Sequence, residues 1–208
     1  MTRNAHAVRL CSLIGLVMVF SACTLFSPGP QPKTRFYMLS SMAASAQPAE
    51  PLARLPQLAV GIGPVRLPEY LDRRNIIVRN SRNEFELAEL SQWAEPLADT
   101  FARVIADNLS FLLGTHRIIQ VPWRSSFPVD CQLAVQVAQF DGRLEEQVVL
   151  RAHWQLFTGD GKKLLESGYS AIEEKIAAPS IEALVTADSR AAERFSREIA
   201  GAIVRVAR

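Results

Sequence analysis

The sequence predicts a single-domain α/β protein in which a mixed, mostly antiparallel β-sheet packs against two long amphipathic helices. Three segments of alternating apolar and polar residues are joined by short turns that contain Asp and Gly, a pattern typical of β-hairpins. Two further segments repeat apolar residues at helical spacing. A chain of 208 residues is short enough to be built around one core.

The chain begins with a segment typical of a secretion signal. Arg3 and Arg9 precede an apolar run over residues 10–20, and a Pro-rich stretch follows Cys23. Eleven apolar residues are too few for a helix across a bilayer core of about 30 Å. They have the usual length of the apolar region of a signal peptide. We therefore assign residues 1–22 to a signal peptide.

The residues before Cys23 indicate how the signal is removed. Ordinary cleavage requires small residues at −1 and −3, and a cut before Cys23 places Phe20 at −3. The sequence Phe-Ser-Ala-Cys instead resembles the bacterial lipobox, with Phe20 in place of the usual Leu. That resemblance implies a diacylglycerol and an N-acyl chain on Cys23, and we expect no other cofactor. By the same resemblance, an Asp directly after the cysteine commonly retains a lipoprotein in the inner membrane. Thr24 occupies this position instead, which favours the outer membrane. The alternatives are a cut after Ala46, far beyond the apolar run, or an incidental Cys23.

The other cysteines agree with this interpretation. Cys11 is removed with the signal and Cys23 carries lipid, so Cys131 has no partner for an intramolecular disulfide. Cys131 lies in an alternating segment, and we expect it to be a small buried core residue rather than a reactive nucleophile.

A tether, residues 23–34, connects the lipidated cysteine to the domain at 35–208. The eleven residues after Cys23 extend over at most about 36 Å, so the domain is held near the membrane. A first strand at 35–40 precedes a linker-like insertion at 41–56, which is rich in Ser, Ala and Pro.

The remaining elements follow from local signals. A helix over 91–113 begins with Ser91 as N-cap, has Pro96 in its first turn and ends at Gly114. The second helix covers 180–206. Pro68 breaks the chain between strands, and a hairpin turns at 81–83. The predicted strands after the insertion are 57–63, 76–79, 84–90, 117–121, 130–140, 146–158 and 164–176.

The charges argue against a nucleic-acid partner. The chain has 23 Lys and Arg residues against 21 Asp and Glu, and two of the basic residues belong to the signal. A neutral domain lacks the basic surface on which nucleic-acid binding depends.

Sequence motifs of catalysis or metal binding are missing. His116 lies in a turn and His153 on a strand surface, and neither is part of an HExxH or CxxC motif. The chain also lacks a GxSxG elbow. We therefore expect neither a metal site nor an enzyme, and a periplasmic hydrolase is the least favoured of three hypotheses.

Aromatic and arginine residues gather instead in irregular chain around 64–74 and 93. These residue types are favoured anchors of protein interfaces. An equally good interpretation is that they pack a loop onto the sheet. The candidate partner-binding residues are Arg66, Leu67, Tyr70, Arg73 and Trp93.

Two segments, GPVRLPEYLDRRNIIVR at 63–79 and SQWAEPLADTFARVIADNL at 91–109, resemble the PqiC/YmbA-type auxiliary lipoproteins of ABC transport systems. The strand RFYML behind the lipobox matches as well. The resemblance implies a non-enzymatic outer-membrane lipoprotein that docks an MCE-family (Pqi-like) periplasmic protein, in a system that moves lipids between the two membranes. The ATPase and permease are then other polypeptides, and a homo-oligomer is compatible with this role.

A periplasmic lipid-binding carrier or chaperone lipoprotein is the alternative function. A sheet covered by amphipathic helices can open an apolar groove between them. A large apolar pocket between helix and sheet would favour this alternative over docking.

We predict that Cys23 is the acylation site and the sole membrane attachment. Stable anchoring needs two or more acyl chains, and Cys23 is the residue that would carry them. The Cys23→Ser variant should therefore remain an unprocessed precursor that its signal peptide retains in the inner membrane. Equal incorporation of radiolabelled palmitate into variant and wild type would contradict this prediction.

Overall fold

The structure, a computed structural model, describes residues 32–44, 50–121 and 127–207. From Thr34 onward these residues belong to one compact unit. The predicted mixed α/β fold class is confirmed. Within the described residues the strands are divided between two sheets, one of five strands and one of three, whereas the sequence places them in a single sheet.

The larger sheet has the strand order β5-β2-β6-β7-β8. Its last three strands form the predicted antiparallel meander. β2 lies parallel to β6 on one side and to β5 on the other. The strand bounds are β2 Val60–Arg66, β5 Ile118–Gln120, β6 Cys131–Gly142, β7 Gln147–Thr158 and β8 Leu164–Lys175.

The smaller sheet has the order β1-β4-β3. The predicted hairpin joins β3 and β4 in antiparallel pairing, and β1 lies parallel to the end of β4. Residue pairs Arg35 with Ser91 and Tyr37 with Trp93 set this register. The bounds are β1 Arg35–Tyr37, β3 Asn75–Arg79 and β4 Phe85–Trp93.

The start of the first helix differs from the sequence prediction. Ser91 is not an N-cap but a strand residue of β4, and α2 (Leu97–Leu113) begins after Pro96. Pro96 has the extended dihedrals φ −51° and ψ 131° and occupies the N-cap position itself. A proline also disfavours helical conformation in the residue before it, so the chain stays non-helical up to this point. Gly114 ends α2 as predicted, in the left-handed conformation that glycine adopts readily.

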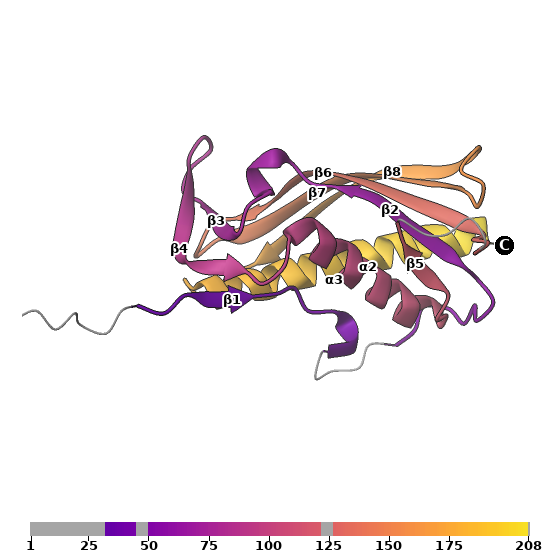
Figure 1. Cartoon of the computed structure of the whole chain (residues 1–208), viewed down its shortest axis with the longest axis horizontal. Helices are drawn as coiled ribbons and strands as arrows, with labels where there is room; N and C mark the ends of the chain where they lie inside the picture. The colour runs from indigo at the N-terminus through magenta and orange to yellow at the C-terminus, as the bar shows by residue number, and fades with distance from the viewer. Residues whose placement is uncertain (1–31, 45–49, 122–126, 208) are drawn as a thin grey trace, which may run out of the picture. The chain divides into compact units, whose positions relative to one another are not determined.

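Both helices cover the same face of the larger sheet. Figure 1 shows α2 and α3 (Ile181–Val206) beside each other below β6, β7 and β8, with the smaller sheet at one end. Ser180 caps α3, because its side chain accepts a hydrogen bond from the Ala183 N–H. Between the layers, the Phe101 ring lies 5.1 Å from that of Phe140 and 6.0 Å from that of Phe195.

A buried amide joins the two helices to the start of the insertion. Asn108 of α2 donates to Ser196 Oγ of α3 at 3.1 Å and accepts from the Met42 N–H at 2.7 Å. Met42 belongs to the short helix η2 (Met42–Ala44), and its side chain is buried. The first residues of the 41–56 segment therefore pack as part of the domain, while residues 45–49 lie outside the described chain.

Asp188 of α3 is a buried carboxylate without a neutralising partner. Its Oδ1 is shielded from solvent and has no hydrogen-bond partner within the described residues. Burial, and next the charge of Asp141, hold the pKa of Asp188 well above its usual value. The folded state therefore resists ionisation of this group.

We predict that Asp188→Asn raises the melting temperature at neutral pH, by about 2–4 °C for each ~1 kcal/mol of relieved cost. A pKa that is higher in the folded state means that Asp188 is fully tolerated only below its unfolded pKa of about 3.9. The free energy of unfolding of the wild type decreases as the pH rises from the unfolded pKa of Asp188 toward its folded pKa. The Asp188→Asn variant has no ionisable group at this position, so it should not show this decrease. Thermal melts across pH test this, with exposed Asp107→Asn as control; parallel pH profiles for wild type and Asp188→Asn would contradict it.

Candidate partner-binding surface

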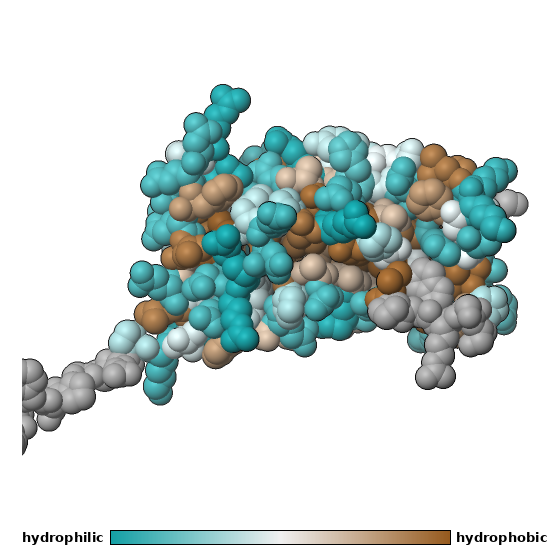
Figure 2. Space-filling view, turned by 45° about the horizontal axis from the view of Figure 1, so that its top comes forward, coloured by the Kyte–Doolittle hydropathy of each residue, from teal (hydrophilic) through white to brown (hydrophobic). Residues whose placement is uncertain are grey.

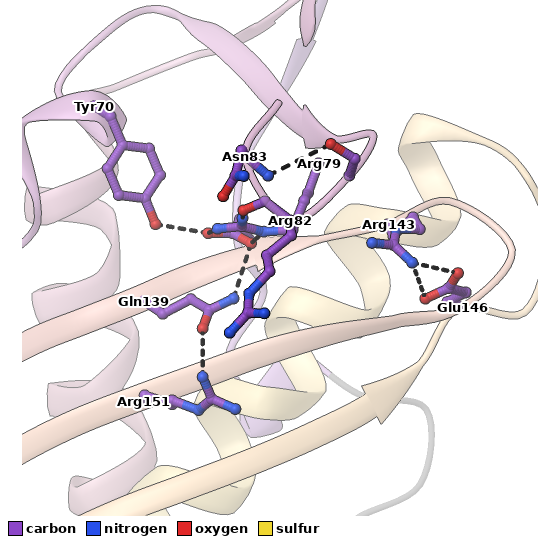
Figure 3. A network of polar contacts seen from close by, with 10 residues as sticks. Tyr70, Arg79, Arg82, Asn83, Gln139, Arg143, Glu146 and Arg151 are labelled. Atoms are coloured by element: carbon purple, nitrogen blue, oxygen red, sulfur yellow. Dashed lines mark hydrogen bonds and ion pairs between the residues drawn. The ribbon is translucent and has the colours of Figure 1, made fainter. Parts of the chain in front are cut away.

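A buried carboxylate organises the region that the sequence singled out. Asp141 lies near the end of β6, and its side chain is fully buried. It accepts hydrogen bonds from the Arg79 guanidinium at 2.6 and 3.0 Å, from the Tyr70 hydroxyl at 2.6 Å and from the Gln139 amide at 3.1 Å. Figure 3 shows these donors converging from three elements: β3, β6 and the short helix η3 (Glu69–Leu71). We call this set the Asp141 network.

The protonation states in the Asp141 network follow from its contacts. Burial by itself raises the pKa of Asp141, but the hydrogen bonds from Arg79, Tyr70 and Gln139 outweigh it and lower that pKa. Burial and the bond to Asp141 raise the pKa of Tyr70. The bond to Asp141 also raises the pKa of Arg79. At neutral pH the site is an ion pair with a neutral phenol beside it, which is a structural arrangement rather than an acid–base pair.

An aromatic contact extends the Asp141 network to β4. The Phe85 ring stacks on Tyr70 with 4.9 Å between centroids, and the Arg79 guanidinium lies 4.3 Å from the Phe85 centroid. Leu71, the next residue in η3, is buried in the core. The segment 67–74 is therefore held by side-chain contacts on one side and by the core on the other. We call it the η3 loop.

The five candidate residues differ in their surroundings. Tyr70 is half-buried in the Asp141 network, and Trp93 is only 8% exposed, so both pack the loop and the start of α2. Leu67 is half-buried against the core. Arg66 and Arg73 are exposed. The five side chains do not form one site, because the two arginines line different hollows.

The first hollow lies on the face of the larger sheet opposite the helices, which we call the open face. Its volume is about 580 Å³. The open face beside it carries a contact between His153 and Tyr169, whose rings are 4.8 Å apart. No carboxylate among the described residues lines the hollow, so none there neutralises the Arg66 guanidinium. The polar side chains that line it are Arg66, Gln136, His153, Gln155 and Ser167.

The second hollow lies beside the smaller sheet. Its volume is about 400 Å³, and it brings Arg73 and Trp93 together. The exposed ring of Phe36 and the neighbouring Arg74 also line it. Aromatic rings and guanidinium groups thus line this hollow together with the carboxylates of Asp72 and Glu95.

The sequence missed the residues that organise this region. Asp141 and the following Gly142 read as a hairpin turn, but β6 continues through both residues. Arg79 and Phe85 carried no signal beyond strand propensity. Their roles depend on a contact between residues 62 positions apart in the chain, Arg79 and Asp141.

The remaining chemistry-bearing residues lie apart from this surface. Cys131 is buried as predicted, and burial raises the pKa of its thiol to about 11, so it is protonated at neutral pH. The described chain contains no cluster of three or more His, Cys, Asp or Glu residues arranged to hold a metal ion. In that same part of the chain, no helix is both long enough and apolar enough to cross a membrane.

We predict that Asp141→Asn lowers the free energy of unfolding by about 2–3 kcal/mol, because it weakens hydrogen bonds to a charged group in a buried site. Since the folded pKa of Asp141 is lowered, its contribution is present above the unfolded pKa and is lost as the pH falls through the folded pKa. Denaturant unfolding at neutral and acidic pH measures both effects. Asp72→Asn, an exposed carboxylate in the same loop, is the control, and an equal loss in both variants would contradict the prediction.

Comparison with known proteins gives a family match for the sequence and similar solved structures for the fold. A family described as "ABC-type transport auxiliary lipoprotein component" matches residues 37–200. The fold resembles a crystal structure of protein XCC0632 from Xanthomonas campestris, with a TM-score of 0.65 and 13% identity over 83% of this chain and 96% of that one. A crystal structure of an uncharacterized protein aligns with a TM-score of 0.62 and 22% identity over 83% and 99% of the two chains.

Two curated relatives carry a more specific description. The intermembrane transport lipoprotein PqiC of Escherichia coli strain K12 is 27% identical over 92 residues, which are 44% of this chain and 48% of that protein. The protein of the same name from Shigella flexneri matches equally. The aligned region thus spans about half the length of these relatives. With its family match over residues 37–200, the chain belongs to the family of ABC-type transport auxiliary lipoprotein components, and it is similar to PqiC.

Proposed function

We propose that this lipoprotein docks the periplasmic MCE-type subunit of an ABC-type lipid transport system to the outer membrane, and that it does so without catalysis. Family membership supports a role as an auxiliary transport component. The relatives' description as intermembrane transport lipoproteins supports a place between two membranes. The lipobox at Cys23 and the residue Thr24 after it support the outer membrane as the anchoring side.

The docking proposal depends on the observation that side-chain contacts hold the η3 loop in one conformation. Side chains that are ordered before binding lose little conformational entropy in a complex. The Asp141 network orders this loop through Tyr70, and Arg66 and Leu67 stand at its start. In this proposal Tyr70 and Trp93 position the loop from within, whereas Arg66 and Leu67 contact the partner.

The chemistry of the first hollow indicates which partner surface fits. Arg66 supplies a guanidinium with several donors, and no carboxylate in the described lining neutralises it. Gln136 and Gln155 add amide groups that donate and accept. A partner segment that presents carboxylates or backbone carbonyls would satisfy these groups.

The carrier hypothesis finds less support in the interior. A carrier needs an apolar cavity between helix and sheet, but that space is occupied by the closely spaced rings of Phe101, Phe140 and Phe195, all of them buried. The two hollows described above lie on the outside of the domain, and charged or amide side chains are part of the lining of both. We therefore retain docking as the proposal.

We predict that Arg66→Ala combined with Leu67→Ala weakens capture of the MCE-type subunit by at least tenfold, a loss of about 1.4 kcal/mol or more in binding free energy. Arg66 is exposed, so its truncation should cost little stability, whereas Leu67 packs partly against the core, so its truncation should lower the melting temperature by a few degrees without unfolding the domain. The measurement is a pull-down of the cognate subunit by the detergent-extracted lipoprotein, alongside a thermal melt.

A matched control removes the same kinds of side chain elsewhere. Lys162→Ala with Leu164→Ala deletes an exposed cation and an exposed leucine from the β7–β8 turn. This variant should capture the subunit as the wild type does. Wild-type capture by the Arg66/Leu67 variant would remove the loop from the docking surface.

A further inference from the structure

The outer side of β1 combines an exposed aromatic ring with a group of arginines. Phe36 is 65% exposed, the largest exposed fraction among the large hydrophobic side chains of the described chain. Arg73 and Arg74 lie beside it around the second hollow. We call Phe36, Arg73 and Arg74 the β1 surface. Figure 2 shows small brown patches set among teal residues at the end of the domain where β1 lies.

The exposure of Phe36 is a consequence of how β1 is held. Tyr37 packs against the core, and its carbonyl accepts a hydrogen bond from the Ala94 N–H at 2.9 Å. Successive side chains of a strand point to opposite faces, so Phe36 is directed away from the core. The Phe36 ring is therefore presented to solvent by a strand that is paired with β4.

The β1 surface carries an excess of positive charge. Arg73 and Arg74 are exposed and take part in no ion pair within the described residues. Of the two acidic residues that line the second hollow, Glu95 is already paired with Arg103 at 3.0 Å, which leaves Asp72. Two arginines thus face one unpaired carboxylate, and the surface complements an anionic partner.

Chain length determines which anionic surface lies within reach. Eleven residues separate Cys23 from Arg35, so an acylated Cys23 keeps β1 within about 36 Å of the bilayer, whatever the path of the segment between them. β1 is the first strand after the anchor and the element of the domain that this constraint restricts most. Arginine and aromatic side chains are also the pair that favours a membrane interface, where guanidinium groups meet phosphates and rings enter the headgroup region.

We propose that the β1 surface rests on the anionic phospholipid headgroups of the membrane that holds the acyl chains, with Phe36 in the interface and Arg73 and Arg74 on phosphates. The inference rests on the proposed acylation of Cys23. The acyl chains retain the protein, while the β1 surface orients the domain relative to the bilayer. Arg73 thereby leaves the docking surface, and Arg66 and Leu67 at the other end of the η3 loop serve the protein partner.

The experiment uses the mature chain, extracted from cell membranes in detergent and reconstituted into vesicles that contain phosphatidylglycerol or only phosphatidylcholine. An environment-sensitive fluorophore is attached at Phe36→Cys, and in a second protein at Tyr169→Cys, an exposed aromatic position on β8. In phosphatidylglycerol vesicles the emission from position 36 should shift to the blue, and that from position 169 should not. High salt should reverse the shift, because it screens exposed charges.

A charge variant tests the arginines in the same labelled protein. Arg73→Gln with Arg74→Gln should reduce the ratio of lipid-contacting to lipid-free domains by about fivefold for each arginine removed. Lys162→Gln with Lys163→Gln removes two exposed charges from the β7–β8 turn and should leave the shift intact. Thermal melts check that both variants fold, and all four side chains are exposed.

Vesicle flotation separates the two levels of the proposal. A chain that does not float with the vesicles overturns the acylation of Cys23. A chain that floats but whose position 36 reports water in every vesicle overturns the lipid contact alone. If the Arg73/Arg74 variant keeps the blue shift and loses capture of the MCE-type subunit, the two arginines bind the protein partner and their assignment to lipid phosphates is wrong.

Discussion

The burial of Asp141 is the constraint on which the surface of this protein depends. A carboxylate removed from water must be paired and hydrogen-bonded, or the folded state loses several kcal/mol. Its donors come from η3, β3 and β6 itself, so one buried group couples the smaller sheet, the η3 loop and the larger sheet. Phe85 adds β4 to this set through its contacts with Tyr70 and Arg79. Any movement of the loop would leave the carboxylate short of a donor.

The two buried aspartates differ in what their burial achieves. Asp141 meets three donors, so its pKa falls and its charge stabilises the fold. Asp188 has an oxygen without a partner, so its pKa rises and its ionisation is costly. The same physical event, removal of a carboxylate from water, thus gives opposite pKa shifts. The difference lies in the groups that face each side chain.

A fixed η3 loop gives the domain two surfaces of different chemistry. The hollow on the open face is lined by uncharged polar groups, a histidine and Arg66, which suits a protein partner with carbonyl or carboxylate groups. The hollow beside β1 has aromatic rings and, among the described residues, two unpaired arginines against one unpaired carboxylate, Asp72, which suits a phosphate-rich interface. In the proposed arrangement, an anchored lipoprotein meets its membrane with one surface and a transport subunit with the other. The packing of the domain fixes the distance between these two surfaces.

Local sequence signals were sufficient for much of the fold. The β6–β8 meander, the β3–β4 hairpin, α3 with its Ser180 cap and the Gly114 stop depend on neighbouring residues, so periodicity and turn chemistry predict them. The buried state of Cys131 follows in the same way from its place in an alternating strand. The tertiary structure decided what depends on distant contacts: the division into two sheets, the parallel pairing of β1 with β4 that takes Ser91 out of the helix, and the burial of Trp93. It also decided that Asp141, which reads as a turn residue, pairs with Arg79 and Tyr70, because only the packing of one sheet against the other brings these side chains together.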